Sequence, residues 1–335
     1  MRIFNYLRAF RIVVCMCSIF GLFFLYLPRK ENCIKTMNTT VGFDRVDVLC
    51  VGSSHMSRGI NPLQMYRDKG FASYIIWGGS QSPWQSYYFL KKSLDKQKPV
   101  MVILDAYMIG AADQTYYKDY QTVINLLDTP ISVDKLQAVL ASEAESKTDI
   151  LLRFPYLHDS YDKVFGLTWE KYYGNTDYLM GGLYENGLFL YTDVEDVTDV
   201  TGETVISPKN EEYLRKIIEF CHSRDIELII SNAPSPTINS EIQKRFNYIG
   251  KIAKEYDVPF IDGNRICKEI GIDWTNDCLD RSGHLNCGGI SKYTAYVEDY
   301  ISENYTVPDR RGNDEYLTYD EGVKRLYEEN NIQDN

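Results

Sequence analysis

The chain of 335 residues is 44% hydrophobic and 25% charged, so it can bury one sizeable core, and one large domain with an insertion is predicted. Its net charge is −11, and without residues 1–30, which hold five basic and no acidic residues, it is −16. A body this acidic repels nucleic acid and anionic lipid headgroups, which excludes both as expected partners. The eight cysteines include no Cys-x-x-Cys pair, and no two histidines have ligand spacing, so neither a metal nor another cofactor is expected.

An apolar run lies near the N-terminus. Residues 12–27 contain nothing more polar than Ser18 and Gly21, and basic residues flank the run on both sides. The run is near the lower length limit for crossing a bilayer and no small-x-small cleavage site follows it, so residues 1–30 are predicted to be an uncleaved membrane anchor. The heavier positive charge on the N-terminal side places the rest of the chain outside the cell. The alternatives are a removed signal peptide and a buried helix, and residues 31–44 are expected to be a polar linker.

The first predicted strand leads directly into a serine turn. Residues 46–51 are mainly apolar and β-branched, as in a parallel strand buried on both faces, and Gly52 ends the run. Open α/β sheets keep their reactive groups outside the carboxyl ends of the strands, so Ser54 is the candidate nucleophile. The alternative is an ordinary turn in which the hydroxyls of Ser53 and Ser54 cap the next helix.

Two further helix and strand units follow. A helix over residues 61–70 precedes strand 73–76, and a helix over residues 84–94 precedes strand 100–104. This alternation is the pattern of a doubly wound parallel sheet. Asp105 ends the third strand at the same edge, where it makes a hydrogen bond in the site, helps to place His284, or caps the next turn.

Two glycines follow the second strand. Gly78 and Gly79 allow backbone amides to approach a ligand closely, which the binding of an oxyanion requires. The alternative is a plain strand-to-helix turn with Pro83 at the first helical position.

The alternation is lost over residues 107–206. A hundred residues are too many for a loop, so a helical insertion lying over the crevice is predicted. The insertion is rich in tyrosine, whose rings stack on sugars or simply pack with their hydroxyls in water. His158, beside Asp159, is a second candidate base, although it lacks a glycine-flanked loop near the C-terminus.

The alternation returns after residue 207 and gives five strands in total. The expected elements are helix 210–223, strand 226–231, helix 238–256, strand 259–262 and helix 290–304. They complete an α/β domain over residues 45–304, and residues 305–335 form a tail that either packs back or stays mobile.

A loop near the C-terminus supplies a base and an acid. Asp280 lies four residues before His284, and glycines flank the loop. A serine attacks a carbonyl only if a base removes its proton and a third group orients that base. Ser54, His284 and Asp280 are therefore the predicted catalytic residues. Cys278 and Cys287 flank the loop and would bridge in an oxidising compartment.

These motifs resemble a known family. Gly-Ser-Ser-His at residues 52–55 and Asp-x-x-x-His at residues 280–284 are similar to the SGNH (GDSL-like) hydrolase superfamily, and the resemblance spans roughly residues 46–304. It is strongest to the membrane-anchored, cell-surface subgroup that includes the D-alanyl transfer protein DltD and polysaccharide O-acetyltransferases. The resemblance implies a flavodoxin-like strand order of 2-1-3-4-5 and an oxyanion site made by the amides of Ser54 and Gly79, with Gly78 one register away.

The sequence departs from the family pattern in two places. Arg281 stands three residues before the histidine, where the family has its acid, so Asp277 and a backbone carbonyl are alternatives to Asp280 as the partner of His284. The Gly-x-Asn-Asp block has no counterpart after the third strand, where residues 105–108 read Asp-Ala-Tyr-Met, and one oxyanion donor is left unassigned.

The predicted function is that of a membrane-anchored extracellular serine esterase or O-acyltransferase that acts on acyl groups of cell-surface glycans through an acyl-enzyme on Ser54. Expected partners are an acylated glycan or small ester, the membrane, and a membrane-bound O-acyltransferase. The alternative is a catalytically inactive SGNH-fold protein that binds or assembles surface polysaccharide. An α/β-hydrolase is disfavoured because its nucleophile elbow needs glycine where Met56 stands.

Overall fold

The computed structural model describes most of the chain. The described residues are 6, 8, 10–19, 33–111, 119–127, 129, 132–142, 147–152 and 177–330. Residues 10–19 are helical, but much of the predicted anchor, including residues 20–30, lies outside the described ranges. None of the helices in these ranges combines the length and the apolar content that crossing a bilayer requires.

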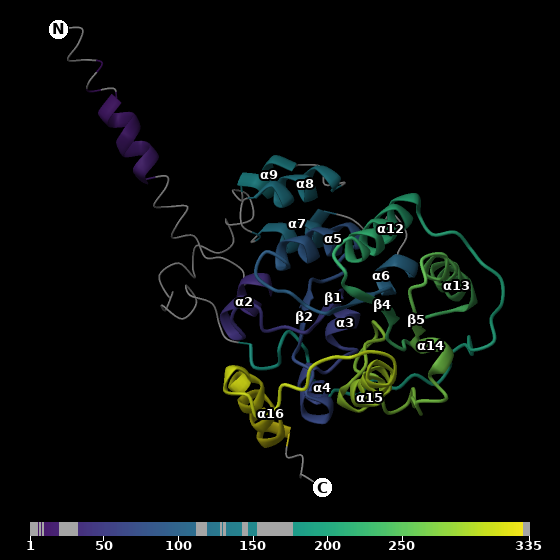
Figure 1. Ribbon diagram of the computed structural model, residues 1–335. Helices are drawn as coiled ribbons and strands as arrows, with labels where there is room; N and C mark the ends of the chain where they lie inside the picture. Colours follow the sequence, from purple (N-terminus) through teal and green to yellow (C-terminus); the bar gives the residue numbers. More distant parts are fainter. Residues whose placement is uncertain are drawn as a thin grey trace.

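The centre of the molecule is a five-stranded sheet in which every neighbouring pair is parallel (Figure 1). The strands are β1 (Val48–Gly52), β2 (Ser73–Trp77), β3 (Met101–Asp105), β4 (Glu227–Asn232) and β5 (Phe260–Asp262). Their order is β2-β1-β3-β4-β5. The predicted α/β class, parallel sheet and 2-1-3-4-5 order are confirmed.

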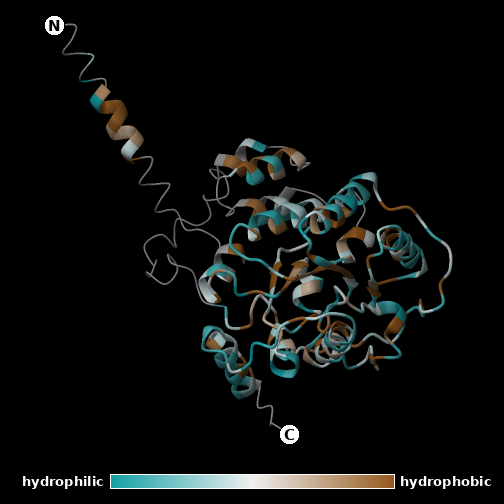
Figure 2. Ribbon diagram, in the orientation of Figure 1, coloured by the Kyte–Doolittle hydropathy of each residue, from teal (hydrophilic) through white to brown (hydrophobic). Residues whose placement is uncertain are grey.

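Alternate residues of β1 pack on opposite faces of the sheet. Leu49 and Val51 belong to one apolar cluster, and Val48 and Cys50 belong to the other, and all four are fully buried. The period-two alternation of a strand explains this division, and a strand covered on both faces must be apolar at every position. Figure 2 shows the result as hydrophobic strands surrounded by helices that are hydrophilic on their outer sides.

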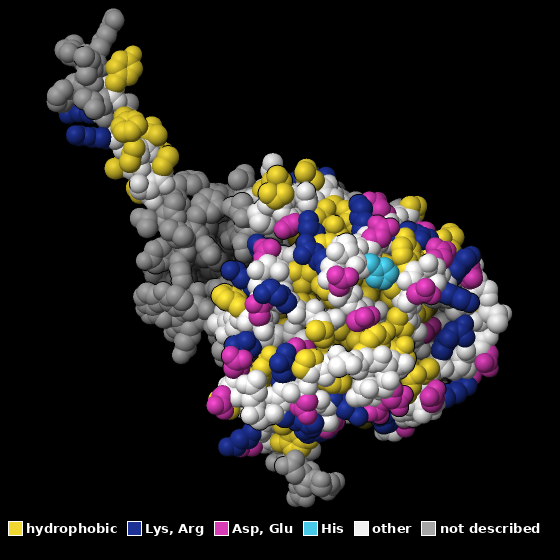
Figure 3. Space-filling view, viewed as in Figure 1, with side chains coloured by type: hydrophobic (Ala, Val, Ile, Leu, Met, Phe, Trp, Pro, Cys, Tyr) yellow, Lys and Arg dark blue, Asp and Glu magenta, His cyan; other side chains and the backbone are white. Residues whose placement is uncertain are grey.

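Helices cover both faces. The first cluster is formed with α5 (Pro83–Ser93), α12 (Pro208–His222) and α13 (Ser240–Glu255), and the second with α15 (Cys287–Asn304). The shorter helices are α3 (Ser54–Ser57), α4 (Pro62–Lys69), α6 (Tyr107–Gly110) and α14 (Gly263–Ile266). On the face seen in Figure 3, acidic and basic side chains are interspersed.

The expected linker is part of the domain. Within residues 31–44 the chain forms α2 (Cys33–Thr40), in which Ile34 and Met37 are buried in the first apolar cluster. The few apolar residues of this segment fall on one helix face, so they can be buried although the segment as a whole is polar. The domain therefore begins at α2, before the expected boundary at residue 45.

The C-terminal tail also packs back. It contains a 3-10 turn, η3 (Asp314–Tyr316), and helix α16 (Leu317–Asn330), whose Tyr319 ring stacks on Tyr66 of α4 with 5.0 Å between ring centroids. Arg310 donates from Nε and Nη2 to the two carboxylate oxygens of Asp47, each at 2.8 Å, just before β1. The domain thus extends well beyond residue 304.

The insertion is helical only in part. Its described N-terminal portion holds α6, α7 (Asp119–Leu127), α8 (Val133–Ala141) and α9 (Lys147–Leu152). Residues 177–206 contain neither helix nor strand, which corrects the expectation of a helical insertion throughout. This segment runs along the site: the Leu183 amide donates to the Ser57 carbonyl at 2.8 Å, and Arg58 pairs with Glu185 at 2.8 Å. His158, the second candidate base, lies outside the described residues.

Candidate active site

Ser54 is the first residue of a short helix that starts at the carboxyl end of the central strand. β1 ends at Gly52, and Ser53 is the N-cap of α3, where its hydroxyl accepts a hydrogen bond from the His55 amide at 3.2 Å. Serine is a favoured N-cap because its oxygen accepts from the first free amides of a helix. The capping alternative thus applies to Ser53, and it leaves the hydroxyl of Ser54 for other contacts.

Asp105 fixes the serine turn from the neighbouring strand. Its Oδ2 accepts from the Ser53 amide at 3.0 Å and from the Ser53 hydroxyl at 2.6 Å, and its Oδ1 accepts from the Tyr107 amide at 2.9 Å. Burial raises the pKa of Asp105, and the hydrogen bonds from Ser53 oppose that rise. A Cβ on Gly52 would overlap the Asp105 side chain, so only glycine fits there. Asp105 thus makes the expected hydrogen bond in the site and also accepts from the first amide of α6, whose N-cap is Ala106.

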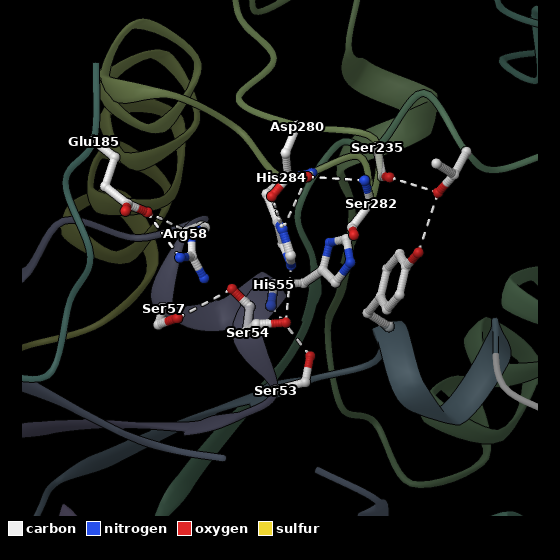
Figure 4. A network of polar contacts seen from close by, with 12 residues as sticks. Ser53, Ser54, His55, Ser57, Arg58, Glu185, Ser235, Asp280, Ser282 and His284 are labelled. Atoms are coloured by element: carbon white, nitrogen blue, oxygen red, sulfur yellow. Dashed lines mark hydrogen bonds and ion pairs between the residues drawn. The ribbon is translucent and has the colours of Figure 1, made fainter. Parts of the chain in front are cut away.

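His284 lies between Ser54 and Asp280 (Figure 4). Its Nε2 is 2.8 Å from the Ser54 Oγ, and its Nδ1 is 2.9 Å and 3.1 Å from the two carboxylate oxygens of Asp280. The two contacts use opposite nitrogens of the ring, so one tautomer can donate to the carboxylate and accept from the hydroxyl. The tertiary structure thus brings together the three residues that were predicted to form the site.

The carboxylate of Asp280 is suited to stay ionised. Burial alone would raise its pKa, but hydrogen bonds from His284 and from the Ser282 amide lower the pKa below its usual value. Arg281 does not pair with it, because the guanidinium lies over the Phe189 ring, 5.8 Å from the centroid.

The alternative acid has other partners. Asp277 is buried and accepts from the Asp273 amide and from Lys292 Nζ, both at 2.7 Å. Its carboxylate therefore joins the loop to α15, and the contact to His284 comes from Asp280.

Backbone pairing, and not a disulfide, holds the loop. Cys278 and Cys287 are both free and buried, so the suggested bridge is not formed. The backbone of Cys278 instead pairs with that of Leu285 as an isolated antiparallel β-bridge. In addition, the Leu279 amide donates to the His284 carbonyl at 2.8 Å. Burial raises the pKa of the Cys278 thiol to about 12, which keeps the thiol protonated.

The two glycines after β2 differ in their hydrogen bonds. The Gly78 amide donates to the Gly52 carbonyl at 3.4 Å, whereas the Gly79 amide donates to no partner among the described residues. The Gly79 carbonyl accepts from Asn125 Nδ2 of α7 at 2.9 Å. Of the two glycines, Gly79 is thus the one with an amide available for a ligand. Asn125, which holds this turn, carried no signal in the sequence.

A second histidine belongs to the site and was missed as a functional residue. His55 follows Ser54 directly, is buried, and lies with its ring between those of Tyr107 and His284. Its place next to the candidate nucleophile was the only available signal. Over the described part of the chain, no group of three or more His, Cys, Asp or Glu side chains is arranged to hold a metal ion.

Comparison with known proteins adds little. No protein-family model matches the sequence, and no curated protein matches it. Several solved structures match, among them a "putative acylhydrolase" from Bacteroides fragilis, with 11% identity over 76% of this chain and 86% of that chain, at a TM-score of 0.36. At this level of similarity nothing follows about the activity of the present chain.

Proposed function

We propose that this protein is a serine esterase or O-acyltransferase of the SGNH type, with Ser54 as nucleophile. The observation that carries the proposal is the continuous contact from Asp280 through His284 to the Ser54 hydroxyl. A serine with a base at hydrogen-bond distance and a carboxylate on the far side of that base is the arrangement that activates a hydroxyl for attack on an acyl carbonyl.

In the first half of the reaction, Ser54 Oγ bonds to the acyl carbon while its proton passes to His284 Nε2. Asp280 stabilises the resulting imidazolium. The tetrahedral adduct collapses when the ester C–O bond breaks, and the departing alkoxide takes the proton from His284. In the second half, water or an acceptor hydroxyl attacks the acyl-enzyme, gives its proton to His284, and releases Ser54 with the proton returned.

The amides of Ser54 and Gly79 are the proposed oxyanion donors. Ser54 occupies the first position of α3, where a helix has no internal acceptor for the amide. At the end of β3, where the family has its Gly-x-Asn-Asp block, the amides are already used, because Ala106 donates to the Ser231 carbonyl and Tyr107 to Asp105. We therefore assign these two donors and none of the backbone amides at the end of β3.

The finer parts of the proposal come from the sequence. The apolar run at residues 12–27 and the family resemblance support a membrane-anchored enzyme with an extracellular domain. The same resemblance supports acyl groups of cell-surface glycans as substrates, with a membrane-bound O-acyltransferase as partner. Hydrolysis and transfer share the first half of the reaction and differ only in the acceptor.

Labelling with a fluorophosphonate tests the proposal directly. The wild-type protein should be labelled once, on the peptide that contains Ser54, and Ser54→Ala should abolish labelling. Ser57→Ala is the matched control, because this serine lies on the same helix and, among the described residues, its hydroxyl bonds only to the Ser54 carbonyl, at 3.1 Å. A folded wild-type protein that is not labelled would instead support the alternative of an inactive SGNH-fold binding protein.

A second experiment separates the two reactions. Release of acid from a small ester such as p-nitrophenyl acetate measures hydrolysis, and addition of an oligosaccharide acceptor measures transfer. Faster release of the alcohol with acylated sugar as product identifies a transferase, and an unchanged rate with free acid as product identifies an esterase.

A further inference from the structure

His55 occupies an unusual place beside the proposed catalytic pair. Its ring is stacked on Tyr107, with 3.3 Å between ring centroids and 15° between the planes, and its centroid lies 4.4 Å from that of His284 at 41°. The side chain is only 5% exposed. Figure 4 shows the His55 and His284 rings next to each other, above the helix that carries Ser54.

Hydrogen bonds at both its amide and its hydroxyl hold Tyr107 in place behind the His55 ring. Its amide is bound by Asp105, and its hydroxyl lies 3.1 Å from the Thr237 hydroxyl, which in turn lies 2.9 Å from that of Ser235. The same two hydroxyl residues lie against Gly283, where an added Cβ would overlap Ser235 and come within 2.8 Å of Thr237. The His284 loop and the Tyr107 ring thus both pack against Ser235 and Thr237.

The orientation of the His284 ring depends on more than its two hydrogen bonds. Asp280 and Ser54 contact opposite nitrogens of the ring, and both contacts change when the ring turns about its Cβ–Cγ bond. Such a turn carries Nε2 away from the Ser54 hydroxyl, and small misalignments of a base reduce the rate strongly. The His55 ring packs against His284, with 4.4 Å between ring centroids, and opposes this turn.

The protonation state of His55 is compatible with close packing against the His284 ring. Burial, and then the neighbouring His284 and Arg58, lower the pKa of His55 well below its ordinary value. At neutral pH its ring is therefore uncharged, and it does not repel the imidazolium that forms on His284 during the reaction. Contact between aromatic rings also stabilises the pair by more than the burial of their surface area alone.

We propose that His55 is a positioning residue, whose neutral ring is held by Tyr107 and fixes the orientation of the His284 ring toward Ser54. The role is mechanical, so it requires a flat aromatic ring at residue 55 and does not require the imidazole nitrogens. This inference rests on the proposed function, since it assigns a role within the same site.

The test compares His55→Phe with His55→Ala. With a small ester as substrate, we expect kcat of His55→Ala to fall roughly ten- to a hundredfold while KM changes less than about twofold, because orientation of the base affects the chemical step and not substrate binding. His55→Phe should keep kcat within about threefold of wild type because it retains the ring. His222→Ala, which removes an exposed histidine from α12, is the control and should leave both constants unchanged.

The outcomes separate the two claims. A wild-type protein that neither hydrolyses esters nor labels at Ser54 contradicts the proposed function. An active wild type with an equally active His55→Ala, or with a His55→Phe as impaired as His55→Ala, overturns the positioning role. A readout independent of activity is the exchange of the His284 Nδ1 proton with water, followed by NMR, which should speed up in His55→Ala and not in His55→Phe; equal exchange in all three proteins also overturns the role.

Discussion

The carboxylate of Asp280 lies 2.9 Å from Nδ1 of His284, on the opposite side of the ring from Ser54. The spacing of four residues, one more than in the resembled family, does not prevent this contact, because Gly283 takes a left-handed conformation with φ of 76° and turns the loop back on itself. The left-handed region is readily open to glycine alone, so the extra residue is accommodated by the backbone.

Asp280→Asn tests this contact. We expect the fold to remain and kcat/KM to fall by roughly two to four orders of magnitude, because the amide holds the wrong tautomer of His284 and does not stabilise the imidazolium. Ester hydrolysis by the purified variant measures the loss. Asp277→Asn is the matched control: it weakens the bonds to Asp273 and Lys292, so it should lower the melting temperature and leave kcat/KM of the folded protein nearly unchanged. The reverse pattern would make Asp277 the functional acid.

Gly283→Ala should damage both stability and activity. A left-handed alanine costs roughly 1–2 kcal/mol, and here the new methyl group also overlaps Ser235, so the loop that carries His284 must move. Gly271→Ala carries only the cost of a left-handed alanine, because Gly271 has φ of 71° and no atom within 4 Å of the added carbon, so the comparison isolates the effect of the overlap. Urea unfolding should show a loss in both variants, and only Gly283→Ala should lose kcat. Equal kcat in the two variants would show that the position of the loop does not matter.

Glu298 predicts a pH dependence of stability. This residue of α15 is 3% exposed, and burial, followed by the nearby Asp68, raises its pKa to about 8. A folded-state pKa above the unfolded value means that the folded protein binds the proton more tightly. Protonated Glu298 therefore contributes fully to the free energy of unfolding at acid pH, and this contribution is lost as pH rises to about 8. Glu298→Gln stays neutral and should melt higher than wild type at pH 8, with a smaller difference at pH 5. Glu303→Gln, at an exposed position of the same helix, is the control; parallel melting curves for Glu298→Gln and wild type across this range would contradict the assignment.

The N-terminal run predicts the behaviour of the whole chain in a membrane fraction. The full chain should sediment with membranes and need detergent for release, and protease outside intact cells should digest its domain. A chain that starts at residue 31 keeps α2 and should stay in the supernatant with the same ester hydrolysis rate. Full protection from external protease would reject the extracellular assignment and the glycan substrate with it.

Local sequence was sufficient for the strands and for the residues of the site. A strand that is buried on both faces has to be apolar along its whole length, so β1 and β3 are visible without any partner. Ser54, His284 and Asp280, which the structure brings into contact, were predicted because a candidate nucleophile, base and acid are recognised by residue type beside glycine turns, and the strand order came from the family resemblance.

Only the tertiary structure decided the contacts between distant parts of the chain. The bond from Asp105 to Ser53 spans 52 residues and that from His284 to Ser54 spans 230, and no local pattern specifies either partner. For the same reason the sequence placed α2 and the tail outside the domain. Each has only a few apolar residues, and their burial depends on contact with a distant part of the chain. The stack of Tyr107, His55 and His284 joins three segments, and it exists because the sheet brings the ends of β1 and β3 to the loop before α15.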